Sequence, residues 1–423
     1  MTWPADSHGT GAAKALIPVD EQVERVLRQV HTPDPIELAL LDAQGLLCAE
    51  EVVSRVRLPG FDNSSMDGYA VLAADVFDAS DAEPAALPVV GDVAAGERVP
   101  HGVLRGQTVR IMTGAPMPAG ADAVVPVEWT DGGVARVLIR KPARRGLNVR
   151  RAGEDVEPGD VAITVGTPIG PAQVGLLAAV GRERVLVHPR PRVVVISTGS
   201  ELVDVGQRPG PGEIVDTNSY ALAAAARDAG AEVYRVGIVA DDKSRLLEVL
   251  EGQLLRADIL ITSGGVSAGA YDVVKDALGE LGTVSFDRVA MQPGMPQGFG
   301  TLGAHRTPFF GLPGNPVSAL VSFEVFVRPA IRLMLGKRRI FRRTVQATLT
   351  SDVEKPAGRR QYRRGLLSRE RGGGHGVESV GGTGSHLLAG MARSNCLIVL
   401  DEDATSVRAG TKVTVLPLLL SGA

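Results

Sequence analysis

The sequence predicts a multidomain protein of the α/β plus β class, whose central domain is a doubly wound parallel α/β sheet. The chain has 423 residues, more than the roughly 250–300 at which a single hydrophobic core stops growing. Between residues 186 and 336, short apolar runs alternate with helical patterns, as in successive βαβ units. The flanking segments contain short apolar runs broken by glycine and proline, which is typical of small β domains.

Charge and composition exclude several classes of protein. The formal net charge is −3, whereas a nucleic-acid-binding protein is expected to carry a basic stripe. No window approaches the roughly 18 apolar residues of a membrane-spanning helix, and the first residues lack the apolar core of a signal peptide. Cys48 and Cys396 lack metal-binding spacing and are predicted to be small buried side chains. We therefore expect no nucleic acid, no membrane and a cytoplasmic location.

A discontinuous helical linker domain is predicted from residues 18–50 and 141–185. Apolar residues recur with helical spacing from Val19 to Val30, and a second helix is predicted over residues 36–47, after two prolines. A further helix is predicted over residues 168–180. The charged segment 141–160 is basic and then acidic, which fits either a solvated loop or an anion-binding site.

Residues 51–140 predict a β-rich domain. Its expected strands cover residues 87–90, 108–112 and 123–125. Two polar clusters, residues 61–69 and 112–122, hold more Asp, Asn, Ser and Gly than a connecting turn requires. Turn chemistry alone accounts for either cluster by itself, so a functional role for them stays open at this point.

The central domain, residues 186–336, has its expected strands at 193–196, 233–239, 259–262, 283–289 and 309–312. The third strand runs into Ser263-Gly264-Gly265, and the last one into Pro313-Gly314-Asn315. Glycine lets the backbone approach a ligand closely, and helix N-termini attract anions. Ligands of such sheets bind beyond the carboxyl ends of the strands. A phosphate-binding cleft is therefore predicted there, with a plain capped βα turn as the alternative.

Carboxylates gather at the same predicted edge, namely Glu201, Asp241, Asp242 and Asp272. Such a set suits Mg²⁺, which is held by one or two carboxylates together with substrate phosphates. The sequence contains no nucleophile elbow, P-loop or dinucleotide fingerprint. The residues alone thus predict a metal-assisted, phosphate-binding α/β enzyme of undefined substrate. Residues 337–423 predict a C-terminal β domain with strands at 344–349, 360–364 and 396–400.

Six ordered motifs resemble those of a known family: residues 62–70, 110–115, 151–155, 197–201, 263–267 with Asp272, and 313–316. From about residue 18 to 418 the chain is similar to the MoeA-type molybdopterin molybdenumtransferases, which are related to the E domain of gephyrin. The resemblance implies a central domain of the molybdopterin-binding type, a C-terminal β-barrel-like domain and a homodimer. It also implies the reaction, in which molybdate is inserted into adenylylated molybdopterin with Mg²⁺ and AMP is released.

Carried over position by position, the resemblance implies two groups of site residues, one of which includes the metal-binding residues. The catalytic group is Asp67, Thr113, Asp155, Glu201, Asp241, Asp272 and Arg288, of which Glu201, Asp241 and Asp272 would hold the metal. The substrate-binding group is Ser263, Gly264, Gly265, Ser267, Pro313, Gly314, Asn315, Ser318, Arg363 and Ser385. A molybdopterin adenylyltransferase and target molybdoenzymes are further implied partners.

One segment departs from the family pattern. Where the family has Lys-Pro-Gly-Lys, this chain has Gln292-Pro-Gly-Met295, although Arg288 keeps a positive charge just upstream. Each lost charge-assisted hydrogen bond costs about 1.5–3 kcal/mol, or roughly ten- to a hundredfold in affinity. We expect an active transferase because the acidic set is complete. A weakly catalytic molybdopterin-binding scaffold and a molybdopterin adenylyltransferase are the alternatives, and the additional β domains argue against the second.

Overall fold

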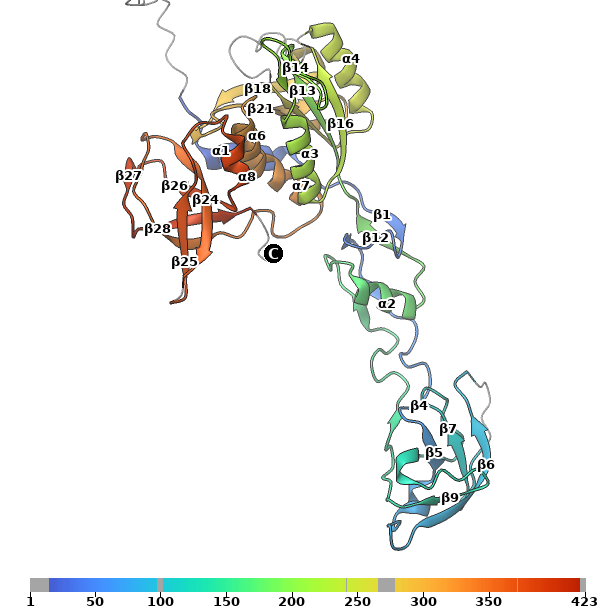
Figure 1. Ribbon diagram of the computed structural model, residues 1–423. Coiled ribbons are helices and arrows are strands. Elements are labelled where there is room, and N and C mark those ends of the chain that lie inside the picture. The colour runs from blue at the N-terminus through green and yellow to red at the C-terminus, as the bar shows by residue number, and fades with distance from the viewer. Residues whose placement is uncertain (1–14, 97–101, 241, 265–277, 371, 419–423) are drawn as a thin grey trace, which may run out of the picture. The chain divides into compact units, whose positions relative to one another are not determined.

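The computed structural model describes residues 15–96, 102–240, 242–264, 278–370 and 372–418 (Figure 1). Its contacts divide the chain into two compact units, residues 37–187 and residues 1–36 with 188–423, and each unit is described by itself. In the described residues, no helix has the length and hydrophobicity needed to cross a lipid bilayer.

The unit of residues 37–187 begins with short strands and one helix. Strands β1 (Ile36–Ala39), β12 (Arg184–His188) and β2 (Leu47–Cys48) form a sheet. Strand β3 (Val52–Val53) pairs with β11 (Val161–Ile163), and α2 covers Pro171–Ala179. The helix predicted over residues 36–47 is therefore wrong. Ile36, Leu38 and Leu40 alternate with Glu37 and Ala39, a period of two that suits a strand, and turns follow.

The remainder of this unit is a small β domain. Its five-stranded sheet has the order β8–β5–β7–β6–β9, with a core that includes Tyr69, Val125 and Ile139. The bounds are β5 Gly68–Val71, β6 Ala85–Val93, β7 Thr108–Ile111, β8 Ala123–Pro126 and β9 Arg136–Ile139, with the 3₁₀ turns η1 Ala73–Val76 and η2 Val127–Trp129. A separate pair joins β4 (Asn63–Ser64) to β10 (Val149–Arg150).

The other unit is built around a six-stranded sheet of order β16–β13–β17–β21–β20–β18. The strands are β13 Arg192–Thr198, β16 Glu232–Val239, β17 Ile259–Ser263, β18 Gly282–Arg288, β20 Pro296–Leu302 and β21 Thr307–Leu312. The first four strands in the sheet order are parallel, as predicted. Strands β20 and β18 add an antiparallel edge.

The sequence analysis missed β20 because glycine and proline there resemble a loop. The glycines instead allow close strand contact. A Cβ at Gly300 would lie 1.9 Å from the carbonyl oxygen of Thr283, and one at Gly298 would lie 2.7 Å from the Phe286 ring. Glycine in this strand therefore serves packing and not a turn.

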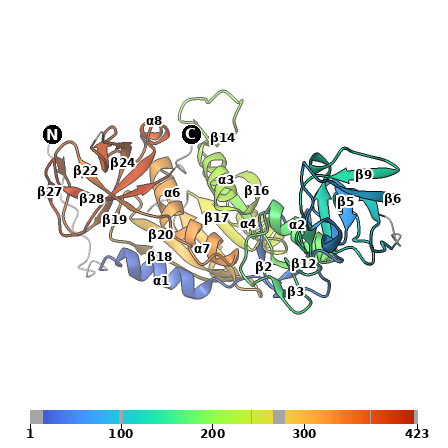
Figure 2. The same ribbon diagram turned by 90° about the horizontal axis from the view of Figure 1, so that it is seen from below.

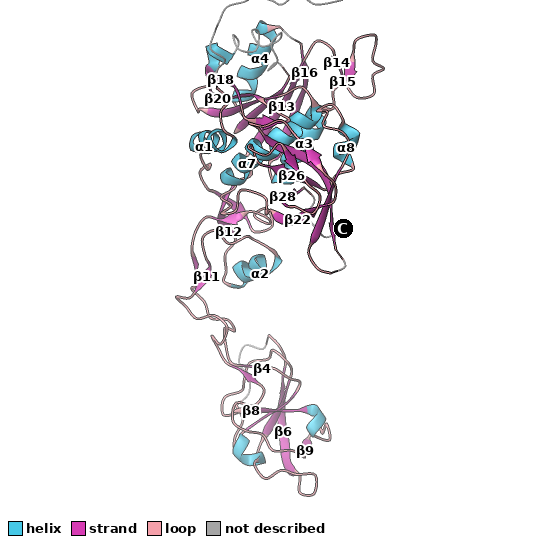
Figure 3. Cartoon of the chain, turned by 90° about the vertical axis from the view of Figure 1, so that its left-hand side faces the viewer, coloured by secondary structure: helices cyan, strands magenta, loops and turns pink. Residues whose placement is uncertain are grey.

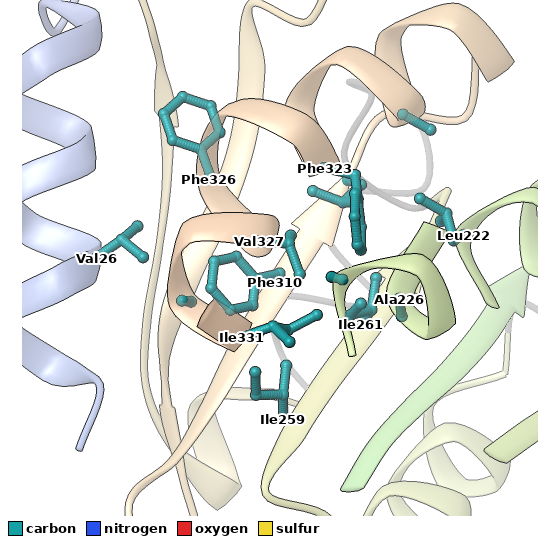
Figure 4. Close-up of a cluster of buried hydrophobic side chains, with 14 of the residues drawn as sticks. Val26, Leu222, Ala226, Ile259, Ile261, Phe310, Phe323, Phe326, Val327 and Ile331 are labelled. Atoms are coloured by element: carbon teal, nitrogen blue, oxygen red, sulfur yellow. The ribbon is translucent and has the colours of Figure 1, made fainter. Parts of the chain in front are cut away.

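Helices cover both faces of the sheet. One face carries α1 (Val19–Gln29), α3 (Asn218–Ala229), α6 (Pro316–Ser322), the π-helical turn η3 (Phe323–Val327) and α7 (Arg328–Met334). Helices α3, α6 and α7 lie side by side on it (Figure 2). Their shared core packs Phe323 and Leu222 over Ile261 and Phe310 (Figure 4). Leu246 and Leu250 of α4 (Lys243–Leu254) cover the opposite face. Burial of such side chains is worth about 1.5–3 kcal/mol each.

The C-terminal domain consists of strands apart from the short helix α8 (Leu388–Ala392), within the part of the chain described (Figure 3). Five strands close into a barrel in the order β24–β25–β22–β28–β26, because β24 also pairs with β26. They are β22 Val345–Leu349, β24 Arg360–Arg369, β25 His375–Ser379, β26 Cys396–Leu400 and β28 Lys412–Pro417. Strand β19 (Met291–Gln292) adds to β24, and β23 (Val353–Glu354) pairs with β27 (Ser406–Val407). The predicted fold class, with its barrel-like C-terminal domain, is confirmed.

Candidate functional site

A pocket of about 530 Å³ opens at the carboxyl ends of β13, β17 and β21. The strands end at one level, since Ser197 is in register with Ser263, and Ser263 with Leu312. The pocket is lined by Ser197, Thr198, Glu201, Leu202, Ile214, Val215, Asp216, Thr217, Asn218, Ser263, Gly264, Gly314, Asn315, Pro316, His386 and Leu388. It thus brings together five predicted site residues: Glu201, Ser263, Gly264, Gly314 and Asn315.

The two glycine turns approach each other across the floor of this pocket. Gly264 has a φ of +98°, and a Cβ there would lie 2.3 Å from the carbonyl oxygen of Thr198. A Cβ on Gly314 would lie 3.8 Å from the Cα of Gly264. Only glycine adopts the Gly264 conformation without strain, so this turn is open to close backbone contact with a ligand.

The sequence analysis missed a polar network among the residues that line the pocket. Asp216 is 1% exposed and accepts hydrogen bonds from Ser197 Oγ at 2.8 Å, from Ser219 N at 3.0 Å and from Ser219 Oγ. Asn218 Nδ2 donates to Ser263 Oγ at 2.7 Å and to the Gly314 carbonyl oxygen at 2.6 Å. Asp216 and Asn218 therefore tie together the ends of all three strands.

The signal for this network was the run Asp216-Thr-Asn-Ser219 between a short apolar pair and a helix. By its residue types this run predicts no more than a helix cap at residues 217–219. Thr217 does occupy the N-cap position of α3, but its side chain makes no capping hydrogen bond. The buried carboxylate of Asp216 binds the Ser219 amide instead.

Glu201 is the described member of the predicted metal-binding set. It is exposed and lines the pocket, and its carboxylate folds back over Gly199, where a Cβ would lie 2.6 Å from Glu201 Oε2. Asp241, Asp272, Gly265 and Ser267 lie outside the described residues. Within the described ranges, no three His, Cys, Asp or Glu side chains gather in a way that could hold a metal ion.

The helix α6 begins at the pocket, since Asn315 and Pro316 both line it. Asn315 holds the N-cap position, is exposed and makes no capping side-chain bond, while Pro316 opens the first turn. Pro313 and Ser318 are buried and do not line this pocket. The carbonyl oxygen of Ser385 accepts a hydrogen bond from Val317 N at 3.0 Å, so the C-terminal domain reaches the first turn of α6.

Arg363 lies in a second and smaller pocket of about 20 Å³ between α6 and the barrel. Gln292 and Val317 line it as well, so adjacent residues of α6 face the two pockets. Arg363 Nε donates to Gln361 Oε1 at 2.9 Å, and its Nη2 donates to the Glu354 carbonyl oxygen at 2.6 Å. Burial lowers the pKa of the Arg363 guanidinium.

Arg288 is exposed at the end of β18, in register with Pro296 of β20. Because β20 runs antiparallel to β21, this end of β18 belongs to the same edge of the sheet as Leu312. Arg288 Nη2 lies 3.4 Å from the sulfur of Met295. Of the two residues that depart from the family pattern, Gln292 thus lines the Arg363 pocket and Met295 contacts Arg288.

Three motifs converge in the β domain of residues 37–187. Thr113 donates its backbone N–H at 2.7 Å and its hydroxyl at 2.8 Å to Asp67 Oδ1. The Thr113 backbone bond is the main reason that the pKa of Asp67 lies below its ordinary value. Asp62 accepts from Arg151 Nη1 at 2.5 Å and from Ala152 N at 2.8 Å. Asp155 is exposed a few residues further, and its N–H donates to the Leu58 carbonyl oxygen.

A largely parallel sheet with a glycine-lined pocket at its carboxyl edge defines a ligand-binding α/β protein. Family models match along the chain: the MoeA N-terminal region (domains I and II) at residues 17–181, a probable molybdopterin-binding domain at 194–333, and the MoeA C-terminal region (domain IV) at 346–418. The chain belongs to the MoeA family of molybdopterin molybdenumtransferases.

Relatives of known name are similar over nearly the full length. Molybdopterin molybdenumtransferase 1 of Mycobacterium tuberculosis is 51% identical over 94% of this chain and 98% of its own length. The enzyme of Haemophilus influenzae is 37% identical over 95% of this chain and 98% of its own. The crystal structure of a molybdopterin biosynthesis MoeA protein from Pyrococcus horikoshii has a TM-score of 0.80 at 33% identity, covering 96% of this chain and all of that one. These names favour a transferase over the scaffold and adenylyltransferase alternatives.

Proposed function

We propose that this chain inserts molybdate into adenylylated molybdopterin and releases AMP. The observation that carries the proposal is the pocket at the carboxyl ends of β13, β17 and β21. The chain that holds it is similar, over nearly its whole length, to relatives named molybdopterin molybdenumtransferase. Molybdopterin carries a phosphate, and the pocket offers the hydroxyl of Ser263, the side chain of Asn315 and the N-terminal ends of α3 and α6. Helix N-termini and hydroxyl donors are suited to bind phosphate.

The closely spaced backbones of Gly264 and Gly314 support the same role. They leave room for a phosphate group beside the floor of the pocket, and Asn218 holds the two turns at a fixed separation. A rigid floor matters for transfer chemistry, because donors that are already oriented stabilise developing charge without reorganising. The Asp67–Thr113 cluster and Asp155 are proposed as further substrate residues, supported by the oriented Asp67 carboxylate.

Mg²⁺ is proposed as the cofactor. The exposed carboxylate of Glu201 on the pocket wall fits the ion, which prefers one or two carboxylates together with phosphate oxygens. Glu201, with Asp241 and Asp272, would hold it. When bound, Mg²⁺ neutralises phosphate charge as the bond to AMP breaks. Glu201 and Asn315 line the same pocket, so the phosphate group would meet a metal-binding carboxylate and an amide side chain there.

The proposed enzyme is a homodimer in a reducing cytoplasm. A molybdopterin adenylyltransferase would supply its substrate, and molybdoenzymes would receive its product. The free and buried thiols of Cys48 and Cys396 support a reducing compartment. Sedimentation of the purified chain tests the dimer, since a monomer at micromolar concentration would contradict it. Cell fractionation tests the location.

The central experiment supplies purified chain with adenylylated molybdopterin, Mg²⁺ and molybdate, and measures AMP. Glu201→Ala is expected to lower the rate by at least about a hundredfold, the typical effect of removing one charge-stabilising group. Glu251→Ala, which removes an exposed carboxylate from α4, is the matched control and should keep the full rate. No AMP release by the unaltered chain, although it binds the substrate, would overturn the proposed transfer.

A further inference from the structure

The pocket contains few positive charges for a site that binds phosphate. Its described lining includes two carboxylates, Glu201 and Asp216, one imidazole, His386, and otherwise hydroxyl, amide, glycine and apolar groups. Among these described residues, His386 is the only side chain that can carry a positive charge. Hydrogen bonds from a cationic donor to a phosphate are roughly twice as strong as neutral ones. Among the described lining residues, His386 is therefore the one that can form such a cationic hydrogen bond.

His386 does not belong to the α/β domain. It is carried by the segment 382–388, which leads from the barrel into α8 and places both His386 and Leu388 in the pocket lining. The segment is attached on both sides of the histidine. Ser385 accepts a hydrogen bond from Val317 N of α6 at 3.0 Å, and Leu387 accepts one from Arg364 Nη1 at 2.7 Å.

Arg364 makes this attachment rigid. It lies on β24, is 5% exposed, and donates its Nη2 to the carbonyl oxygen of Gly382 as well. One buried guanidinium thus binds both ends of the segment through two separate donors. Gly384 gives the imidazole its space, because a Cβ at that position would lie 2.9 Å from His386 Cε1. The side chain of His386 is exposed, and the two hydrogen bonds of Arg364 hold the backbone that carries it.

We infer that His386 is a substrate-binding residue that the C-terminal barrel contributes to the pocket, where its imidazolium donates to a phosphate oxygen of the pterin substrate. The inference rests on the proposed function and deepens it, since it assigns the cationic contact of the pterin phosphate. Both ring nitrogens of an imidazolium are donors, so either can reach an anionic oxygen.

The test is equilibrium binding of molybdopterin to the full-length chain and to four variants. His386→Gln keeps hydrogen-bonding capacity but removes the charge, and it should raise Kd about tenfold or more. His386→Arg restores a cation and should bind more tightly than the glutamine variant. Gly384→Ala leaves the charge and displaces the ring, so an intermediate rise in Kd is expected. His305→Gln makes the same chemical change at an exposed histidine on the opposite edge of the sheet, and it should bind as the unaltered chain does.

AMP release is measured in parallel to separate the two proposals. An unchanged Kd in His386→Gln would overturn the assignment of His386, whatever the rate of AMP release. Equal weakening in His386→Gln and His386→Arg would also overturn it, because charge would then be irrelevant. If the unaltered chain binds molybdopterin but releases no AMP, the proposed transfer fails while the Kd comparison still decides the role of His386. No binding by the unaltered chain would overturn both.

Discussion

The side-chain nitrogen of Asn218 lies 2.7 Å from the hydroxyl oxygen of Ser263, and this bond joins the first turn of α3 to the end of β17. Asn218→Ala should lower the free energy of unfolding by about 1–2 kcal/mol and raise KM for the pterin substrate, because it also releases the Gly314 carbonyl. Urea unfolding and AMP release measure the two effects.

A double-mutant cycle with Ser263→Ala isolates the bond itself. A coupling free energy of about 1 kcal/mol is expected between the two substitutions. Strict additivity would contradict a direct contact between the two side chains.

Gly264→Ala is expected to cost several kcal/mol of stability, since it combines a φ of +98° with a Cβ only 2.3 Å from the Thr198 carbonyl oxygen. Gly252→Ala is the control, because a Cβ there meets nothing within 4 Å and the residue lies inside α4. That change should stabilise the chain by up to about 1 kcal/mol. Thermal unfolding of both variants checks the contrast, and equal melting temperatures would argue against a tight turn at Gly264.

Asp216→Asn is predicted to destabilise the chain by about 2 kcal/mol. The buried carboxylate accepts hydrogen bonds from Ser197 and Ser219, and an amide can only replace part of these acceptors. Asp242→Asn makes the same change at the exposed N-cap of α4, where asparagine caps as well as aspartate does. Denaturant unfolding should leave this control unchanged. A similar loss in both variants would mean that the buried network contributes nothing specific.

Asp67 links stability to acid pH. Its pKa is lowered in the folded chain by the backbone N–H of Thr113 and then by the Thr113 hydroxyl. Ionised Asp67 therefore contributes its full share to the free energy of unfolding above its unfolded-state pKa of about 4. That share is lost as the pH falls through the lower pKa of the folded state. Thr113→Val removes only the hydroxyl and should raise the carboxyl pKa partway toward its ordinary value. A carbon-detected NMR titration measures it, and no change would exclude the side-chain bond.

Replacement of Gln292 tests the departure from the family pattern. Gln292→Lys adds a cation to the pocket that already contains Arg363, so half-maximal AMP release should require about tenfold less molybdate. Because Gln292 and Arg363 line the same pocket, the added charge would act together with that of Arg363, and the gain in molybdate affinity should be measurable. An unchanged molybdate dependence would show that residue 292 does not contact the oxyanion. Gln207→Lys, at an exposed position outside this pocket, controls for the added charge.

The strand and turn chemistry of the central domain could be predicted because local sequence determines it. The strand at Ile259–Thr262 and the turn at Gly264 can be predicted without tertiary information, and the pocket lies where this strand ends. Asp216 could not be assigned in the same way. An aspartate near a helix start can cap, bind solvent or bridge strands, and only the approach of Ser197 from β13 decides between them.

The two largest misinterpretations had different causes. Residues 36–47 contain apolar residues that fit helical spacing, but pairing with β12 selected a strand for 36–39. Strand β20 was hidden because its glycines are required by neighbours, Phe286 and Thr283, that lie more than ten residues away. Long-range contacts thus overrode local propensity at β20, whereas at residues 36–40 the period of two was already present in the local sequence.

The two residues of β19 limit how far this protein can be treated as separable modules. Met291 and Gln292 lie between β18 and β20 of the α/β sheet, yet their backbone pairs in register with Arg360 and Gln361 of the barrel. A fragment that ends at residue 336 would leave that backbone without its partner, and an isolated barrel would lose its added edge. A chimera that takes the C-terminal domain from a relative must therefore take residues 288–296 from the same source, so that both sides of the shared ladder match.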